Sequence, residues 1–163
     1  MIINAIHGTG PNDIYVAGTG PAYIYHWDGV SWDRVYEPPH QFTGHFSGIF
    51  AINPDRVWAV GSPLLLYNGV DWIEVMTAPN AWYGDVWAFD ENDVYFAAGT
   101  LPLPSVGSVV HLDGSGWTQT VIPGAERLTD IWGSSPANMV ATGGEGTVVY
   151  YDACGSITTG IRD

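Results

Sequence analysis

Two aspartates stand at the same place in consecutive copies of a repeated pattern, and they are the first candidates for chemistry. Asp85 precedes Val86-Trp87, and Asp130 precedes Ile131-Trp132. Two carboxylates held close together can share one proton or bind a hard cation such as Ca²⁺. The alternative is that they accept hydrogen bonds from neighbouring backbone N–H groups or water. We favour the alternative. The nearby acidic turn at Asp90–Asp93 lacks the spacing of an EF-hand loop, so a dedicated calcium loop is not predicted either. No cofactor is predicted, and calcium is the cation that this pair would suit.

The five histidines are the other residues that could bind a metal. His40 and His45 share one long loop, but no cysteine or carboxylate framework accompanies them, so they make a poor zinc site. His26 and His111 occupy the same position in two repeats, and the other two repeats have leucine and tyrosine there. That variation indicates packing rather than metal ligation.

Nothing in the sequence selects a catalytic nucleophile. There is no nucleophile elbow, no glycine-rich phosphate loop and no HExxH sequence. Cys154 has no basic neighbour in the sequence that would lower its pKa and activate the thiol. The protein is therefore predicted not to be an enzyme.

The elements that position these residues come from a pattern that occurs four times. Each copy has an apolar strand ending in an aromatic or histidine residue, a turn rich in Pro, Asn and Asp, and a second apolar strand. A period of about 42 residues is typical of propeller blades. We therefore predict an all-β fold, a β-propeller with four blades of four antiparallel strands, in a single domain. The repeats are expected at approximately residues 1–42, 43–80, 81–124 and 125–163.

The later half of each repeat predicts a tight hairpin between the third and fourth strands. The fourth strands are expected to start near Trp32, Trp72, Trp117 and Ile157. Asp-Gly or Asn-Gly before three of them favours a turn with positive φ. The turn-forming residues are Asp28, Asn68, Asp113 and Asp152. The repeated tryptophans are expected to pack between blades.

Two stretches resemble known propeller repeats. Ile14–Gly18 followed by Trp27–Trp32 resembles Kelch-type repeats, and Trp132–Pro136 is similar to bacterial propeller proteins built from tandem Trp-Gly-Ser-Ser-Pro repeats. The resemblance covers nearly the whole chain. The Kelch glycine doublet survives only as Gly143-Gly144, and the last repeat lacks its fourth-strand tryptophan. The resemblance implies a propeller that acts as a binding scaffold, and it carries over no catalytic residues.

Charge excludes several classes of partner. The formal net charge is −13, with four arginines and no lysine. Nucleic-acid binding depends on Lys and Arg, so it is not expected. Membrane insertion is not expected either, since no apolar run reaches 18 residues.

The lone Cys154 excludes an internal disulfide. The composition leaves open a cytoplasmic protein, a particle component or an excised piece, and an extracellular or particle-surface location is favoured.

The repeats differ most in two insertions, and these are the predicted contact surfaces. One lies between the first and second repeats, and the other, which is apolar and uncharged, lies inside the third. The predicted interaction residues are Pro39, His40, Phe42, His45, Leu101, Pro102, Leu103, Pro104 and Val106.

The sequence thus predicts a non-catalytic interaction or structural module that contacts a protein partner or a second copy of itself. A virion surface or tail component and an extracellular filament are examples of such an assembly. The alternative is a lectin-like propeller that binds glycans, because eight Trp and nine Tyr residues supply many surfaces for sugar stacking. Loops that differ from copy to copy favour protein contacts.

Overall fold

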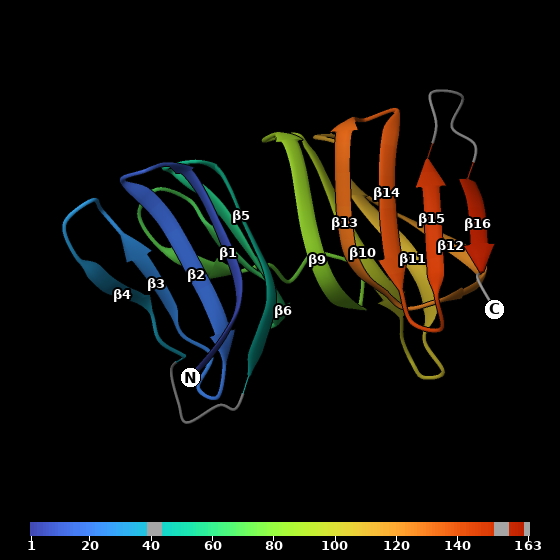
Figure 1. The fold of residues 1–163 in the computed structure, drawn as a ribbon, viewed down its shortest axis with the longest axis horizontal. Coiled ribbons are helices and arrows are strands. Elements are labelled where there is room, and N and C mark those ends of the chain that lie inside the picture. The colour runs from blue at the N-terminus through green and yellow to red at the C-terminus, as the bar shows by residue number, and fades with distance from the viewer. Residues whose placement is uncertain (39–43, 152–156, 162–163) are drawn as a thin grey trace. The chain divides into compact units, whose positions relative to one another are not determined.

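The computed structural model describes residues 1–38, 44–151 and 157–161, and among these every regular element is a β-strand (Figure 1). The predicted all-β class is confirmed. The chain divides into two compact units, Met1–Met76 and Thr77–Asp163, which we call unit 1 and unit 2. This division lies near the expected boundary between the second and third repeats. A single domain covering the whole chain stays a prediction. No described residue belongs to a helix long and apolar enough to span a membrane.

Unit 1 contains two antiparallel four-stranded meanders. The first comprises β1 (Ile2–Gly10), β2 (Asp13–Thr19), β3 (Ile24–Trp27) and β4 (Trp32–Tyr36). The second comprises β5 (His45–Asn53), β6 (Arg56–Ser62), β7 (Leu65–Tyr67) and β8 (Trp72–Glu74). A single pairing of Thr19 with His45 links β2 to β5, so the two meanders form one continuous sheet.

Unit 2 repeats the plan as two separate sheets. The first sheet comprises β9 (Ala81–Asp90), β10 (Asp93–Thr100), β11 (Val106–Leu112) and β12 (Trp117–Glu126). The second comprises β13 (Leu128–Ser135), β14 (Asn138–Gly143), β15 (Thr147–Tyr151) and β16 (Ile157–Ile161). Among the described residues the strand pairing thus contains four four-stranded meanders, and their identity as four propeller blades stays a prediction.

The turn between the third and fourth strands forms as the Asx residues predict. Asp28 Oδ1 accepts hydrogen bonds from the N–H groups of Val30 and Ser31 at 2.7 and 2.8 Å. Asn68 and Asp113 make the same pair of bonds in their own turns. The next residue has a positive φ, which glycine adopts without steric cost; these residues are Gly29, Gly69 and Gly114. Asp152 lies outside the described residues.

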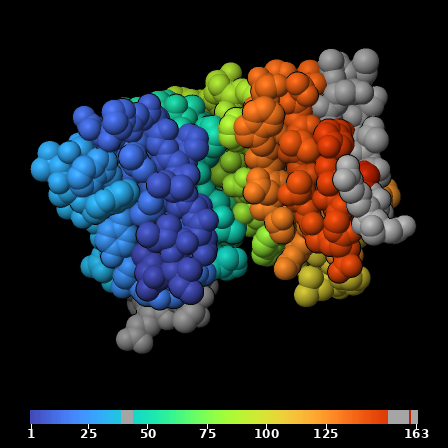
Figure 2. Space-filling model, viewed as in Figure 1, coloured from blue at the N-terminus to red at the C-terminus, as the bar shows by residue number. Residues whose placement is uncertain are grey.

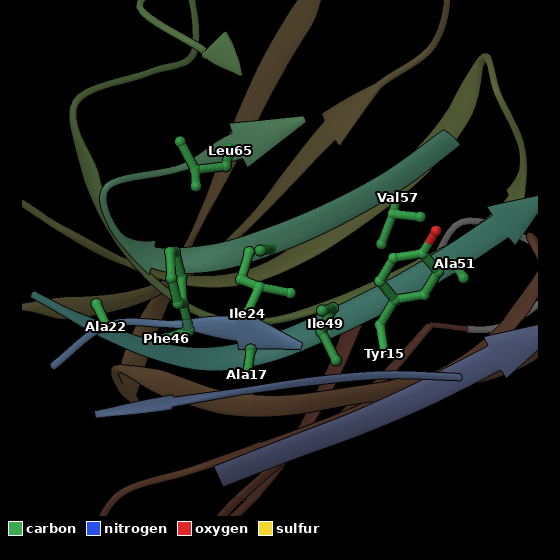
Figure 3. Close-up of a cluster of buried hydrophobic side chains, with 10 residues drawn as sticks. Tyr15, Ala17, Ala22, Ile24, Phe46, Ile49, Ala51, Val57 and Leu65 are labelled. Atoms are coloured by element: carbon green, nitrogen blue, oxygen red, sulfur yellow. The ribbon is translucent and has the colours of Figure 1, made fainter. Parts of the chain in front are cut away.

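The core of unit 1 lies between its two meanders (Figure 3). Alternate residues of a strand point to opposite faces, so Tyr15 and Ala17 of β2 face the second meander. Phe46 at the start of β5 is fully buried and packs edge-on against Tyr36, with ring centroids 5.8 Å apart. The remaining members of the cluster are Ala22, Ile24, Ile49, Ala51, Val57, Ala59 and Leu65.

The core of unit 2 is built from equivalent positions. Leu128 is fully buried at the start of β13, opposite Gly143, just as Phe46 lies opposite Gly61 in unit 1. The other members of this cluster are Ala97, Ile122, Ala125, Ile131, Met139, Ala141 and Val149. A smaller residue thus fills the position that an aromatic ring fills in unit 1.

The repeated tryptophans do not all pack inside. Trp72 is half-buried against the unit 1 core, whereas the side chains of Trp32 and Trp132 are 46% and 51% exposed. Trp132 follows the buried Ile131 in β13 and therefore points to the opposite face of the strand. Trp72 packs on the core that both meanders of unit 1 form, and Trp132 contacts Trp87 of β9 across the two sheets of unit 2, with ring centroids 5.9 Å apart. Packing of the repeated tryptophans between blades stays a prediction.

The first strand of unit 1 belongs to the segment that is dark blue in Figure 2, and it carries exposed apolar side chains. Ile2, Ile3 and Ile6 of β1 are between 60% and 70% exposed. Self-association through this surface stays a prediction.

Candidate functional site

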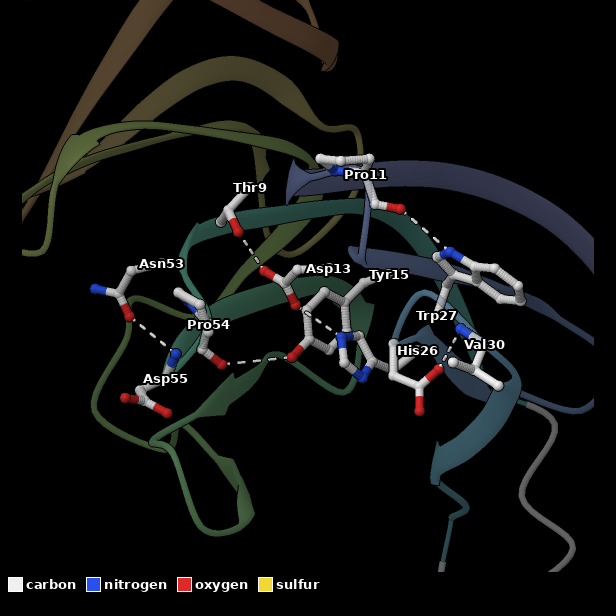
Figure 4. Close-up of polar contacts among 11 residues, drawn as sticks. Thr9, Pro11, Asp13, Tyr15, His26, Trp27, Val30, Asn53, Pro54 and Asp55 are labelled. Carbon is white, nitrogen blue, oxygen red and sulfur yellow. Dashed lines mark hydrogen bonds and ion pairs between the residues drawn. The ribbon is translucent and has the colours of Figure 1, made fainter.

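A histidine, an aspartate and a tyrosine come together in unit 1 (Figure 4). His26 Nε2 lies 2.7 Å from Asp13 Oδ1. The imidazole ring stacks on Tyr15, with ring centroids 4.3 Å apart and planes 25° from parallel. The contact follows from the strand register, which places Tyr15 of β2 directly opposite His26 of β3.

Unit 2 contains the same group with nearly the same geometry. His111 Nε2 lies 2.7 Å from Asp93 Oδ1, and its ring stacks on Tyr95 at 4.0 Å and 10°. Tyr95 and His111 are again directly opposite on adjacent strands. The other two meanders pair tryptophan with leucine and valine with tyrosine at these positions. The group is therefore confined to the first meander of each unit.

The sequence predicted packing for these histidines, and their stacking on tyrosine agrees with it. The carboxylate partner was missed. A signal for it was present, because Asp13-Ile14-Tyr15 and Asp93-Val94-Tyr95 open the second strands of the same two repeats that have histidine in the third strand. Strand alternation puts Asp and Tyr of an Asp-x-Tyr sequence on one face.

The His–Asp–Tyr groups are built as rigid supports. Asp13 also accepts a hydrogen bond from the Thr9 hydroxyl through its second carboxylate oxygen. The Tyr15 hydroxyl donates to the carbonyl oxygen of Pro54, 3.4 Å away. Burial raises the pKa of Tyr15, and the charge of Asp13 raises it further, so this phenol stays protonated at neutral pH. The described residues hold no cluster of three or more metal-ligating His, Cys, Asp or Glu.

A groove runs between the two meanders of unit 1 and uses this group as part of its wall. We call it the unit-1 groove; its volume is about 630 Å³. Its walls include Asp13, Tyr15, His26, Tyr67, Asp71 and Trp72. Tyr36 and Glu37 at the end of β4 also line it.

Aromatic rings form the apolar part of the unit-1 groove. The indole of Trp72 lies 5.4 Å from the ring of Tyr67 and 6.3 Å from the rings of Tyr15 and of Tyr36, measured between centroids. Such mutual contacts fix ring orientation, because edge-to-face and tilted pairs are favourable. The groove therefore presents pre-oriented aromatic surfaces.

Negative charge forms its polar part. Asp13, Glu37 and Asp71 line the unit-1 groove, and no lysine or arginine is among its described lining residues. Arg34 pairs with Glu37 at 2.9 Å from outside the lining, so Glu37 is partly neutralised. Burial raises the pKa of Tyr36, and the charge of Glu74, which lies outside the lining, raises it further. Asp71 lies in an exposed turn, where its backbone N–H donates to Asn68 Oδ1 and its backbone carbonyl oxygen accepts from the Asn68 N–H.

The corresponding groove of unit 2 is smaller and apolar. Its volume is about 170 Å³, and no carboxylate is among its described lining residues. Tyr95 and His111 form one side, with Thr118 and Thr120 beside them on β12. The opposite side consists of the core residues Ile131, Met139, Ala141 and Val149.

Asp85 and Asp130 lie together in unit 2. Asp85 Oδ2 accepts a hydrogen bond from the Ile131 N–H at 3.2 Å, which joins β9 to β13. Burial raises the pKa of Asp85 to about 6, and the neighbouring Asp130 adds to the effect. This is the backbone contact that the sequence favoured over a metal site. Binding of Ca²⁺ by the pair is not tested by this geometry.

The first predicted contact loop is only partly described. Pro39, His40 and Phe42 lie outside the described residues. His45 is the first residue of β5, where it pairs with both Thr19 and Ser62 and is partly buried. It therefore belongs to the sheet rather than to a free loop.

The second predicted contact loop projects from unit 2 between β10 and β11. Leu101 is 42% exposed and Leu103 is 74% exposed, and both prolines beside them are exposed. Val106 is the first residue of β11, and its N–H donates to the Thr100 hydroxyl at 3.0 Å. The exposed part of loop 101–105 is thus residues 101–104, and Ser105 and Val106 are partly buried at its end. Pro102 and Pro104 carry no backbone N–H.

No protein-family model and no curated protein matches this sequence. Solved structures do match. YCF48 from Cyanidioschyzon merolae is 18% identical with a TM-score of 0.67, and the alignment covers 99% of this chain and 56% of that one. A structure of YCF48 bound to D1 peptide is 15% identical with a TM-score of 0.71, covering 99% of this chain and 53% of the other.

These likenesses concern the fold, because both identities are low. The two solved structures are β-propellers, and this chain spans about half of their length. The Kelch repeat type is not confirmed by either of them. The chain is thus an all-β protein whose two units have the fold of part of a β-propeller.

Proposed function

We propose that this chain is a non-catalytic β-propeller module that binds an extended segment of a partner protein, with its four meanders as four blades. The observation that carries the proposal is the unit-1 groove. A cleft of this size, with aromatic walls and a few polar groups, is typical of ligand sites. The match to a propeller that was solved with a peptide adds support.

The unit-1 groove suits a peptide better than a small rigid molecule. It is walled by residues from three strands of the first meander and two of the second. Tyrosine and tryptophan give large contact areas at low entropic cost, which is why they dominate protein recognition surfaces. The stacked His26 and Tyr15 hold one wall in place before binding.

Loop 101–105 supplies a second contact surface in this proposal. Leu101 and Leu103 expose apolar side chains at its tip, and proline stiffening lowers the entropy lost on binding. The hydrogen bond from Val106 to Thr100 holds the two ends of the loop together. In this proposal the partner contacts this loop separately from the segment that binds in the unit-1 groove.

A displayed library of random linear peptides tests the proposal. Panning on the purified chain should enrich peptides with dissociation constants of about 1–100 μM, the range of transient peptide recognition. Tyr67→Ala should weaken them about tenfold or more, since it removes a ring from the groove. The matched control is Val30→Ala, which shortens an 85% exposed side chain outside the lining.

The independence of the loop from the groove is tested with the same peptides. Leu101→Ser together with Leu103→Ser should leave both the fold and the groove affinity unchanged, since these side chains are exposed. If no peptide is enriched, or if Tyr67→Ala and Val30→Ala behave alike, the proposed function is wrong.

A further inference from the structure

We infer that the unit-1 groove takes an arginine side chain of the bound segment. The inference rests on the proposed function and specifies the chemistry of the ligand. Three carboxylates and the aromatic rings of three tyrosines and one tryptophan line one groove, and its described lining includes no basic residue apart from His26. That combination matches a planar cation with an apolar face.

The carboxylates give the groove its preference for positive charge. Asp13 is engaged by His26 and Thr9, and Glu37 by Arg34, so both are partly compensated within the protein. Asp71 differs, because the turn uses its backbone N–H and carbonyl oxygen, and the exposed residue lines the groove next to Trp72. Asp71 is therefore the group best placed to pair with a ligand cation.

The rings favour a guanidinium over other cations. A guanidinium stacks on aromatic faces, is weakly hydrated and donates two parallel hydrogen bonds to a carboxylate. Unit 1 already shows this contact on its surface, where the Arg34 guanidinium lies 4.7 Å from the centre of the Tyr23 ring while pairing with Glu37. The groove offers the same two elements, Trp72 with Asp71, to a ligand.

The overall charge of the chain acts in the same direction. At −13 with no lysine, the protein attracts basic segments at a distance, and that attraction weakens as salt is added. Long-range attraction does not choose a position. The aromatic walls of the unit-1 groove supply the position, since an acidic surface without rings would not distinguish arginine from lysine.

The experiment is a titration of the ¹⁵N-labelled full chain with three blocked pentapeptides, followed by two-dimensional NMR. The central residue is arginine, citrulline or lysine, flanked on each side by two glycines. Citrulline keeps the shape of arginine and removes its charge. The readouts are the indole N–H signal of Trp72 and the backbone amides of Val70 and Asp71.

The arginine peptide should shift these three signals saturably at millimolar concentration, and citrulline should bind about tenfold more weakly. Lysine should fall between them. Asp71→Asn should reduce arginine-peptide affinity about fivefold or more, and Glu145→Gln, which removes one charge from an exposed turn of unit 2, should not. The amide spectra of both variants report whether the fold is kept.

Equal shifts with arginine and citrulline, shifts confined to other residues, or no shift up to about 10 mM would each overturn the inference. The proposed function is judged separately by the displayed library. Enriched peptides that bind the unit-1 groove without a basic residue would overturn the arginine inference and leave the proposed function standing. An empty library would overturn the proposed function itself.

Discussion

Each unit has a groove with the same kind of wall, a His–Asp–Tyr group, and the two grooves differ in the residues that face this wall. In both, a tyrosine stacks on a histidine that pairs with an aspartate at 2.7 Å. In unit 1 the space is about 630 Å³, with aromatic and acidic walls. In unit 2 it is about 170 Å³ and reaches down to core residues.

One position accounts for part of that difference. Tyr36 of β4 lies opposite Ile24, and Thr120 of β12 lies opposite Val109 at the equivalent place. The Tyr36 ring covers Phe46 and contacts Trp72, so it closes the unit 1 core and forms a wall above it. Threonine is too small to do this, and the core of unit 2 stays open below it. We therefore interpret the His–Asp–Tyr wall as a structural support in both units. The residues that face it, such as Tyr36 or Thr120, determine which kind of ligand the groove can bind.

The largest expected effect comes from emptying the two equivalent core positions. Phe46→Ala should lower the free energy of unfolding by about 3–5 kcal/mol, and Leu128→Ala by about 2–5 kcal/mol, because each leaves a cavity in a buried cluster. Urea unfolding followed by tryptophan fluorescence measures both. A change below about 1 kcal/mol for either would mean that its cluster is not a core.

Asp85→Asn should stabilise the protein at neutral pH. This change removes a buried carboxyl group of unit 2. Burial raises the pKa of Asp85 to about 6 from an ordinary value of 3.8, so the ionised form costs stability above pH 6. Wild type gains stability as pH falls from about 6 to 4, and the variant loses its advantage there. An advantage of about 1–3 kcal/mol is expected at pH 7.5.

The pH dependence of that variant is read from urea unfolding at pH 7.5, 6 and 4.5. The amide oxygen of asparagine can still accept the Ile131 N–H, so the contact between β9 and β13 is kept. Destabilisation at every pH would contradict this account. Glu145→Gln, an exposed residue of the same unit, is the matched control.

The shared wall can be weakened equally in both units. Asp13→Asn and Asp93→Asn should each lower the free energy of unfolding by about 1–2 kcal/mol, since each weakens one 2.7 Å charge-assisted hydrogen bond. Only Asp13→Asn should also lower the affinity for the arginine peptide, because only Asp13 lines the unit-1 groove. Equal effects of the two variants on peptide binding would remove the distinction between the grooves.

The smallest effect tests the role of Thr120. Thr120→Leu should place apolar volume over the open cavity and raise the melting temperature by a few degrees, which corresponds to about 0.5–1 kcal/mol. Thr118→Leu, two residues earlier on the same face of β12, is the matched comparison, because Thr118 also lines this groove. Destabilisation by Thr120→Leu would show that the space is not available to a larger side chain.

Local sequence predicted the parts of the fold that depend on local chemistry. Asp28 and Asn68 form the turns that their side chains favour, and the fourth strands begin at the expected tryptophans. The wall of each groove depends on cross-strand register, which brings Asp13 to His26 across 13 positions of chain. That contact could be anticipated only by reading the Asp-x-Tyr sequence together with the histidine of the next strand.

Other features depend on what covers a surface, and no local pattern carries that information. Trp72 and Trp32 begin equivalent strands, yet one packs on a core and the other is 46% exposed. The difference between Tyr36 and Thr120 sets the size of a groove only once two meanders are packed together. An extracellular or particle-surface location and a glycan ligand stay predictions from composition.

The most direct measurement of the central claim is a crystal structure of the chain with a peptide enriched from the library. The account predicts peptide density in the unit-1 groove, with an arginine side chain stacked on Trp72 and bonded to the Asp71 carboxylate. Peptide density at any other surface, with the unit-1 groove empty, would contradict it.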